Sequence, residues 1–122
     1  SFRPGSILVA ESTDPDWVPA LRTAAGVITE RGGRTCHAAI VSRELGIPAI
    51  VGATGALGAI ADAQRITLSC AGGEEGIVYA GAIPARREVL ALDAIPATRT
   101  KVLINLADPA SAFTHWRLPT DG

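Results

Sequence analysis

The chain has 122 residues, which is enough for one compact domain with a real core and too few for two. Its net charge is −1, with 48% hydrophobic and 19% charged residues, so neither nucleic acid nor an anionic membrane is an expected partner. No apolar run approaches the ~20 residues of a membrane span, and no signal peptide is visible. Two cysteines far apart in the sequence then indicate reduced thiols in a cytoplasm. The sequence alone does not decide whether they form a disulfide.

The N-terminal quarter predicts a strand, a helix and a second strand. Residues 7–10 are apolar and follow a Pro-Gly turn, which indicates a short strand. A polar connector leads to a helix over about residues 16–24, and Pro19 is tolerated in its first turn. Residues 26–29 form a second strand that leads into a pair of glycines. Elements that alternate in this way are typical of α/β architectures.

A turn and a longer helix follow this second strand. Gly32 and Gly33 allow the backbone to turn its N–H groups inward. Thr35 is the predicted N-cap of the helix, whose apolar side chains fall on one face. Gly46, with a proline soon after it, is the predicted stop. Residues 49–52 then form a short buried strand.

The next part of the chain predicts a short helix and a β-hairpin. Small residues over 53–63 indicate a helix that is interrupted at Gly55 and Gly58. Strands over 65–70 and 76–80 flank a glycine-rich turn, which is the pattern of a hairpin. Since only 4% of the residues are aromatic, the core is built from Val, Ile, Leu and Ala.

His37 is the strongest candidate for chemistry in the chain. It stands just after the glycine pair, where the helix begins, between Arg34 and Arg43. The N–H groups of the turn and the positive end of the helix dipole attract an anion, and both arginines can contact phosphate oxygens. An imidazole nitrogen is nucleophilic near neutral pH. We therefore interpret His37 as a transiently phosphorylated residue, the alternative being a surface or capping histidine.

The other thiol and imidazole groups predict neither a metal site nor thiol catalysis. Adjacent residues on a helix point about 100° apart, so Cys36 is poorly placed to form a nucleophile–base pair with His37. Cys70 lies in a predicted strand, His115 lies in a polar tail, and there is no Cys-x-x-Cys motif. We interpret Cys36 as a small, half-buried residue and expect no metal ligands in this chain.

Three segments together resemble a known family, namely residues 13–19, 27–40 and 43–52. They are similar to the phosphohistidine domain of the PEP-utilizing enzymes, and the similarity spans about residues 2–83. The Thr-Cys-His triplet at 35–37 favours phosphoenolpyruvate synthase (pyruvate, water dikinase) over pyruvate, phosphate dikinase. The resemblance implies an α/β fold, a compact β/β/α swivelling domain whose histidine moves between two distant active sites.

The resemblance also assigns roles to individual residues. His37 aligns with the phosphorylated histidine. Thr35 aligns with the threonine that a bifunctional regulatory kinase and phosphorylase modifies, and simple helix capping is its alternative role. Gly32 and Gly33 match the glycine pair of the family. Arg34 and Arg43 are carried over as phosphate contacts.

The parent reaction implied by the family converts ATP, pyruvate and water to AMP, phosphoenolpyruvate and phosphate. ATP and Mg²⁺ would be bound by other domains of the same polypeptide, so we expect no cofactor in this chain and no turnover by it alone. We expect the swivelling domain over 1–83, a linker over 84–100, and the truncated, poorly ordered start of the phosphoenolpyruvate/pyruvate-binding barrel over 101–122. A short helix over 86–92 and a strand over 101–106 are predicted in these last parts.

Two alternatives stay open at this point. The chain could be the carrier domain of another phosphotransferase of the family, of the pyruvate, phosphate dikinase or rifampicin phosphotransferase type. It could also be a non-catalytic binding domain that kept the fold and lost the chemistry. The barrel-like tail argues against an antibiotic-modifying enzyme, and the retained histidine, threonine and glycine pair argue against a binding domain.

Overall fold

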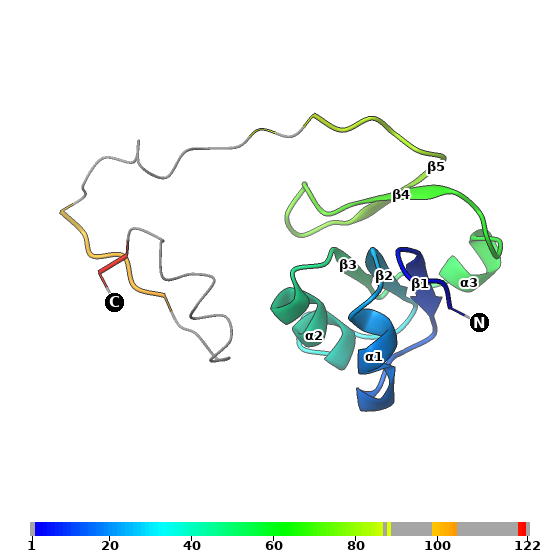
Figure 1. Cartoon of the computed structure of the whole chain (residues 1–122), viewed down its shortest axis with the longest axis horizontal. Coiled ribbons are helices and arrows are strands. Elements are labelled where there is room, and N and C mark those ends of the chain that lie inside the picture. Colours follow the sequence, from blue (N-terminus) through cyan, green and yellow to red (C-terminus); the bar gives the residue numbers. More distant parts are fainter. Residues whose placement is uncertain (1, 87, 89–98, 105–119, 122) are drawn as a thin grey trace. The chain divides into compact units, whose positions relative to one another are not determined.

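The computed structural model describes residues 2–86, 88, 99–104 and 120–121 (Figure 1). The chain divides into two compact units, Ser1–Pro84 and Ala85–Gly122. The helices and strands of the described residues all lie in the first unit. In chain order they are β1 (Ile7–Ala10), the 3₁₀ turn η1 (Pro15–Trp17), α1 (Val18–Leu21), β2 (Gly26–Thr29), α2 (His37–Leu45), β3 (Ala49–Val51), α3 (Ala56–Ala59), β4 (Ile66–Ser69) and β5 (Ile77–Ala80).

A three-stranded parallel sheet forms the middle layer of this unit. Its strand order is β1-β2-β3, and Leu8 pairs with Val27, which pairs with Ala49. All four residues of the central strand β2 are buried, as expected for a parallel strand covered on both faces. Each parallel connection needs a crossover, which α1 and α2 supply. Both helices lie on the same face of the sheet (Figure 1).

The antiparallel hairpin of β4 and β5 covers the opposite face of the sheet (Figure 1). Gly76 allows this close approach. A Cβ atom on Gly76 would lie 2.4 Å from Ile50 Cγ1 of β3, whereas one on Gly26 would meet Leu68 Cδ1 of β4 at an ordinary contact distance of 3.4 Å. The result is a helix layer, a parallel sheet and a hairpin, so the predicted α/β class with β/β/α layers is confirmed.

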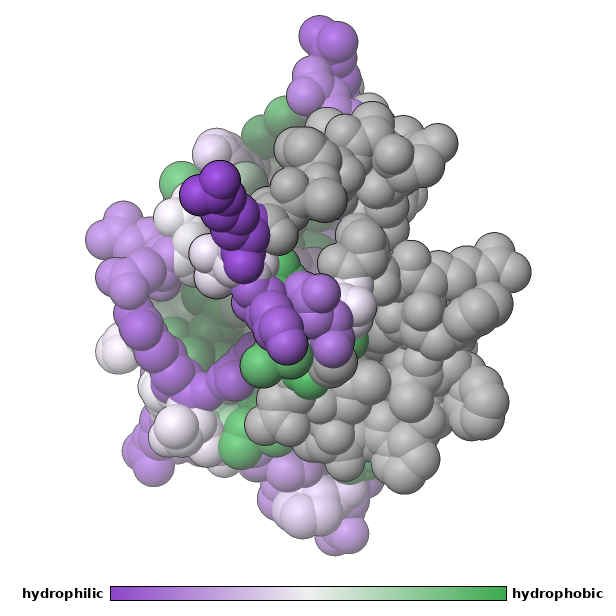
Figure 2. All heavy atoms as spheres, turned by 90° about the vertical axis from the view of Figure 1, so that its left-hand side faces the viewer, coloured by the Kyte–Doolittle hydropathy of each residue, from purple (hydrophilic) through white to green (hydrophobic). Residues whose placement is uncertain are grey.

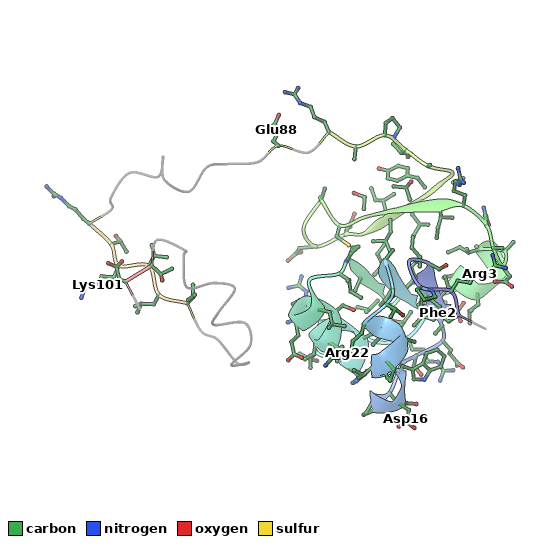
Figure 3. All side chains as sticks on the ribbon, in the orientation of Figure 1. Phe2, Arg3, Asp16, Arg22, Glu88 and Lys101 are labelled. Carbon is green, nitrogen blue, oxygen red and sulfur yellow. The ribbon has the colours of Figure 1, made fainter. Side chains whose placement is uncertain are left out.

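The core lies between the helices and the sheet. Leu8, Leu21, Val27 and Ala38 form its buried cluster, and Phe2 packs against them. Figure 3 shows the side chains that fill this space, with Asp16 of η1 at the far end of the helix layer. Leu21 and Val27 are fully buried, which corresponds to roughly 2 kcal/mol of transfer free energy for each side chain. This packing holds α2 against β2 and β3.

Helix α2 ends where the sequence predicts and begins one residue later. Gly46 takes a left-handed conformation with φ 67°, and its N–H donates to Arg43 O while Ile47 N–H donates to Ser42 O. This pair of bonds is a Schellman motif. The predicted N-cap Thr35 is wrong, because the cap is Cys36, whose backbone is extended and whose side chain makes no capping bond. Thr35 belongs to the preceding turn.

Two further helix predictions need correction. The helix predicted over 16–24 is η1 followed by the short α1, because Ala25 N–H must leave the helix to bond Ser6 O beside β1. Gly55 precedes α3 with φ 86°, as the predicted interruption requires, whereas Gly58 lies inside α3 and does not interrupt it. The strands and the hairpin are confirmed to within a residue at each end.

Fewer of the predicted elements can be compared with the structure in the second unit, because fewer of its residues are described. The helix predicted over 86–92 falls mostly outside the described residues. The strand predicted over 101–106 is not present at residues 101–104, and residues 105–106 lie outside the described part. Val102 instead exchanges two hydrogen bonds with Asp121, whose N–H donates to Val102 O and whose Oδ2 accepts from Val102 N–H. These bonds satisfy the backbone of Val102 without a neighbouring strand.

Candidate functional site

The loop over residues 30–36 connects the end of β2 to the start of α2. Thr29 is fully buried at the end of β2, and its Oγ1 donates a hydrogen bond of 2.8 Å to Arg31 O. Glu30 N–H and Arg31 N–H donate to the carbonyls of Ala10 and Glu11. The loop therefore runs beside the carboxyl end of β1. This edge of a parallel sheet is where open α/β folds bind their ligands.

The two glycines of the loop have different surroundings. Gly32 has φ 116°, and a Cβ atom there would lie 2.7 Å from Cys36 Sγ. Gly33 has no atom within 4 Å of such a Cβ, and its φ is not positive. Only Gly32 is therefore required by conformation and space. Gly33 O accepts from Cys36 N–H and closes the turn that precedes α2.

His37 is the first residue of α2 and is half-buried. The first helical hydrogen bond runs from Ile40 N–H to Cys36 O, so the N–H groups of residues 37–39 have no partner within the helix. These groups and the helix dipole favour an anion beside the imidazole. The position of His37 thus combines a nucleophile with a ready site for negative charge.

Thr13 fixes the imidazole from a neighbouring segment. Its Oγ1 lies 3.2 Å from His37 Nδ1. When Nδ1–H donates to this oxygen, the lone pair of the imidazole is at Nε2, and Nε2 is then the nucleophilic atom. The sequence prediction did not identify this contact. The only signal for it was that Thr13 opens the 13–19 segment, on the connector between β1 and η1.

The two arginines predicted as phosphate contacts have other partners. Arg34 Nη2 lies 2.6 Å from Glu74 Oε1 in the turn between β4 and β5, and Arg43 donates to the carbonyl of Arg34. A second ion pair joins Arg31 to Glu11 at 2.9 Å. Ion pairs thus connect the loop over 30–36 to the segment after β1 on one side and to the hairpin on the other. Exposed pairs of this kind contribute up to about 1 kcal/mol each.

Thr35 and Cys36 complete the loop. Thr35 is exposed, whereas Cys36 is half-buried and packs against the core. Both cysteines are free thiols, so the disulfide left open by the sequence is not formed. No group of three or more potential metal ligands occurs among the described residues. Within the same residues, no helix is long and apolar enough to cross a bilayer.

Comparison with known proteins identifies the family. The family described as PEP-utilising enzyme, mobile domain, matches residues 2–73. The chain belongs to this family. The match covers the whole parallel sheet, both crossover helices and the loop with His37, so the resemblance seen in the sequence motifs is confirmed.

Individual relatives extend the similarity of this mobile domain to the full chain. Phosphoenolpyruvate synthase of Helicobacter pylori is 52% identical over 122 residues, which is 100% of this chain and 15% of the relative. That of Aquifex aeolicus is 51% identical over 121 residues, 99% of this chain and 14% of the relative. That of Escherichia coli K12 is 44% identical over 121 residues, 99% of this chain and 15% of the relative. The chain thus spans about one seventh of the curated relatives that it matches.

Proposed function

We propose that this mobile domain is the phosphohistidine carrier of a phosphoenolpyruvate synthase and that His37 Nε2 holds the phosphoryl group. The observation that carries the proposal is the placement of His37 at the start of α2, with Nδ1 engaged by Thr13 at 3.2 Å. A nucleophilic nitrogen, unpaired helix N–H groups and a conformationally demanding Gly32 meet at one edge of the sheet. The full-length similarity to phosphoenolpyruvate synthases supports the choice of parent enzyme.

In the proposed reaction, Nε2 attacks the β-phosphorus of ATP and forms an N–P bond. The bond from that phosphorus to the AMP oxygen breaks and AMP leaves. Water then attacks the γ-phosphorus, the bond between the γ-phosphorus and the bridging oxygen breaks, and phosphate leaves. Pyruvate loses a methyl proton at its own site, and the resulting enolate oxygen takes the phosphoryl group from Nε2, which restores neutral His37 and gives phosphoenolpyruvate. Nucleotide and pyruvate bind to other domains of the polypeptide. We place Mg²⁺ in those domains as well.

The domain boundaries follow from the same proposal. Residues 1–83 form the swivelling domain, residues 84–100 the linker, and residues 101–122 the start of the phosphoenolpyruvate/pyruvate-binding barrel. The division of the chain into Ser1–Pro84 and Ala85–Gly122 supports a boundary near this linker. The partners of the carrier are then the nucleotide-binding and barrel domains of its own polypeptide, in the cytoplasm.

Thr35 is the proposed point of regulation by a kinase and phosphorylase. Its side chain is exposed and lies two residues before His37. A phosphate on Thr35 adds almost two negative charges beside the approaching phosphoryl donor, and like charges repel. Modified Thr35 would therefore stop transfer to His37 while leaving the fold intact.

The test uses the full-length enzyme with ATP labelled at the β-phosphorus. The only other histidine of these 122 residues, His115, provides the matched control. We expect acid-labile, base-stable label in the wild type and in His115→Ala, none in His37→Ala, and discharge of the label when pyruvate is added. Label that persists in His37→Ala would overturn the carrier role. Label that pyruvate fails to discharge would retain the carrier and assign a different acceptor, as in another phosphotransferase of the family.

A further inference from the structure

Glu30 joins the loop over 30–36 to the start of α3. Its Oε1 accepts a hydrogen bond of 2.9 Å from Leu57 N–H, and the two residues are 27 positions apart in the sequence. Leu57 is the second residue of α3, and the N-cap of that helix is Gly55, which has no side chain that could accept from the first N–H groups. Glu30 therefore supplies, from a distant segment, the capping acceptor that α3 lacks locally.

The segment between β3 and α3 contacts the same loop at two further points. Ala53 N–H donates a hydrogen bond of 2.9 Å to Thr29 O, at the end of β2. A Cβ atom on Gly52 would lie 3.2 Å from Gly32 O, so the two backbones lie in close contact there. With the carboxylate bond to α3, these contacts place the segment beside the first half of the loop.

The contacts continue along the loop to His37. Gly32 packs directly against Cys36, since a Cβ atom on Gly32 would lie 2.7 Å from Cys36 Sγ. Cys36 is the N-cap of α2, and His37 is the first residue of that helix. A displacement of the segment before α3 would therefore free Gly32 to move, and Gly32 contacts the residue that immediately precedes the imidazole.

We propose that Glu30 is a positioning residue for phosphoryl transfer, because its carboxylate fixes the start of α3 against the loop that carries His37. The bond runs from a neutral amide to a charged oxygen, and such bonds are stronger than those between neutral groups. Glu30 takes no part in bond making or bond breaking in this role. The consequence for the transfer rate rests on the proposed carrier function of His37.

The first test is single-turnover labelling of the full-length enzyme by ATP labelled at the β-phosphorus. In Glu30→Ala the rate constant at saturating ATP should fall about fivefold, the effect of one hydrogen bond. The ATP concentration for half-maximal labelling should stay unchanged, because ATP binds to other domains. Glu30→Gln keeps an acceptor oxygen and should restore the rate constant to within about twofold of the wild type. A wild-type rate constant in Glu30→Ala, or an equal loss in Glu30→Gln, would overturn the proposal.

Two simpler explanations of a slow variant have to be separated from positioning. A merely unstable fold would lower the amplitude of labelling and not its rate constant. A change of surface charge is a second explanation, since hydrophilic side chains are prominent on the face drawn in Figure 2. Glu11 also contacts the loop, through an ion pair of 2.9 Å with Arg31, so Glu11→Ala removes the same charge without touching α3. It should label at the wild-type rate, and an equal loss of rate in both variants would overturn the positioning role.

A second test needs neither ATP nor the other domains. Amide chemical shifts of the ¹⁵N-labelled 122-residue chain are compared between the wild type and Glu30→Ala. We expect changes at Leu57 and also at Gly32 and His37, whereas Glu11→Ala should leave Leu57 unchanged. Changes confined to α3 and the substituted residue would overturn the proposal. Absence of label in the wild-type enzyme would contradict the carrier function instead, and the amide shifts would then decide by themselves whether Glu30 positions His37.

Discussion

Gly32 and Gly33 form a matched pair for testing the geometry of the loop that carries His37. They are adjacent in sequence, yet a Cβ atom on Gly32 would lie 2.7 Å from Cys36 Sγ and 3.1 Å from Cys36 Cβ, whereas one on Gly33 would have no neighbour within 4 Å. The φ of Gly32 is also 116°, a region that L-residues rarely adopt. The same substitution should therefore destabilise the fold at position 32 and have little effect at position 33.

The expected cost of Gly32→Ala has two parts. A positive φ costs an L-residue about 1–2 kcal/mol. Displacing the Cys36 side chain from a packed position costs about 1–3 kcal/mol more. The free energy of unfolding should thus fall by about 3 kcal/mol. Gly33→Ala should change it by less than about 1 kcal/mol, and in the stabilising direction if the unfolded chain loses freedom.

Urea denaturation of the 122-residue chain, followed by far-ultraviolet circular dichroism, measures both variants. With a urea m-value of about 2 kcal/mol/M, the midpoint of Gly32→Ala should fall by about 1.5 M. Adding Cys36→Ala to Gly32→Ala removes the contact with Sγ and should recover part of the packing cost, while the contact with Cβ of residue 36 at 3.1 Å and the cost of φ remain. Equal midpoints for Gly32→Ala and Gly33→Ala would refute the reasoning about this loop.

Two more predictions concern phosphoryl transfer in the full-length enzyme. Thr13→Val removes the hydroxyl that holds His37 Nδ1, and single-turnover labelling by ATP should slow about fivefold, the effect of one hydrogen bond. Thr13→Ser should restore the rate. Thr35→Asp places a negative charge beside the incoming donor, and labelling should slow at least tenfold while the urea midpoint stays unchanged.

Each of these predictions has a control within the chain. Thr23→Val removes a hydrogen bond of 3.1 Å from Thr23 Oγ1 to Ala20 O, far along the chain from His37, and should leave the labelling rate unchanged. An equal loss of rate in Thr13→Val and Thr23→Val would mean that Thr13 acts through general stability. For Thr35→Asp the control is Thr35→Asn, which has the same shape without the charge. Equal inhibition by both would contradict the electrostatic mechanism.

Much of the fold could be predicted from local signals. The end of α2 was predictable because Gly46 has to take φ 67°, and few other residues do so readily. The hairpin was predictable because two β-rich runs flank a glycine turn. The length of α1 could not be predicted in this way. It depends on where the backbone must turn so that Ala25 N–H reaches Ser6 O beside β1, and that contact joins residues distant in sequence.

The residues of the site also differ in how far their determinants lie along the sequence. His37 could be singled out because the glycine turn and the helix start are its sequence neighbours. Its partner Thr13 lies 24 residues away, and the partner of Arg34 lies 40 residues away at Glu74. Residue type made both arginines candidates for phosphate, and only the fold pairs Arg34 with Glu74 of the hairpin turn and Arg43 with the carbonyl of Arg34. Long polar side chains follow the nearest opposite charge in space, which sequence spacing does not reveal.

The geometry of the loop over 30–36 depends more on its buried contacts than on its charges. The ion pairs of Arg31 and Arg34 are more than half exposed on both partners, so each contributes little to stability. Buried Thr29 and the close approach of Gly32 to Cys36 leave the backbone few other conformations. The arginines are therefore able to change partners without moving His37. In the proposed carrier role, such a loop can change its surface ion pairs while His37 stays aligned.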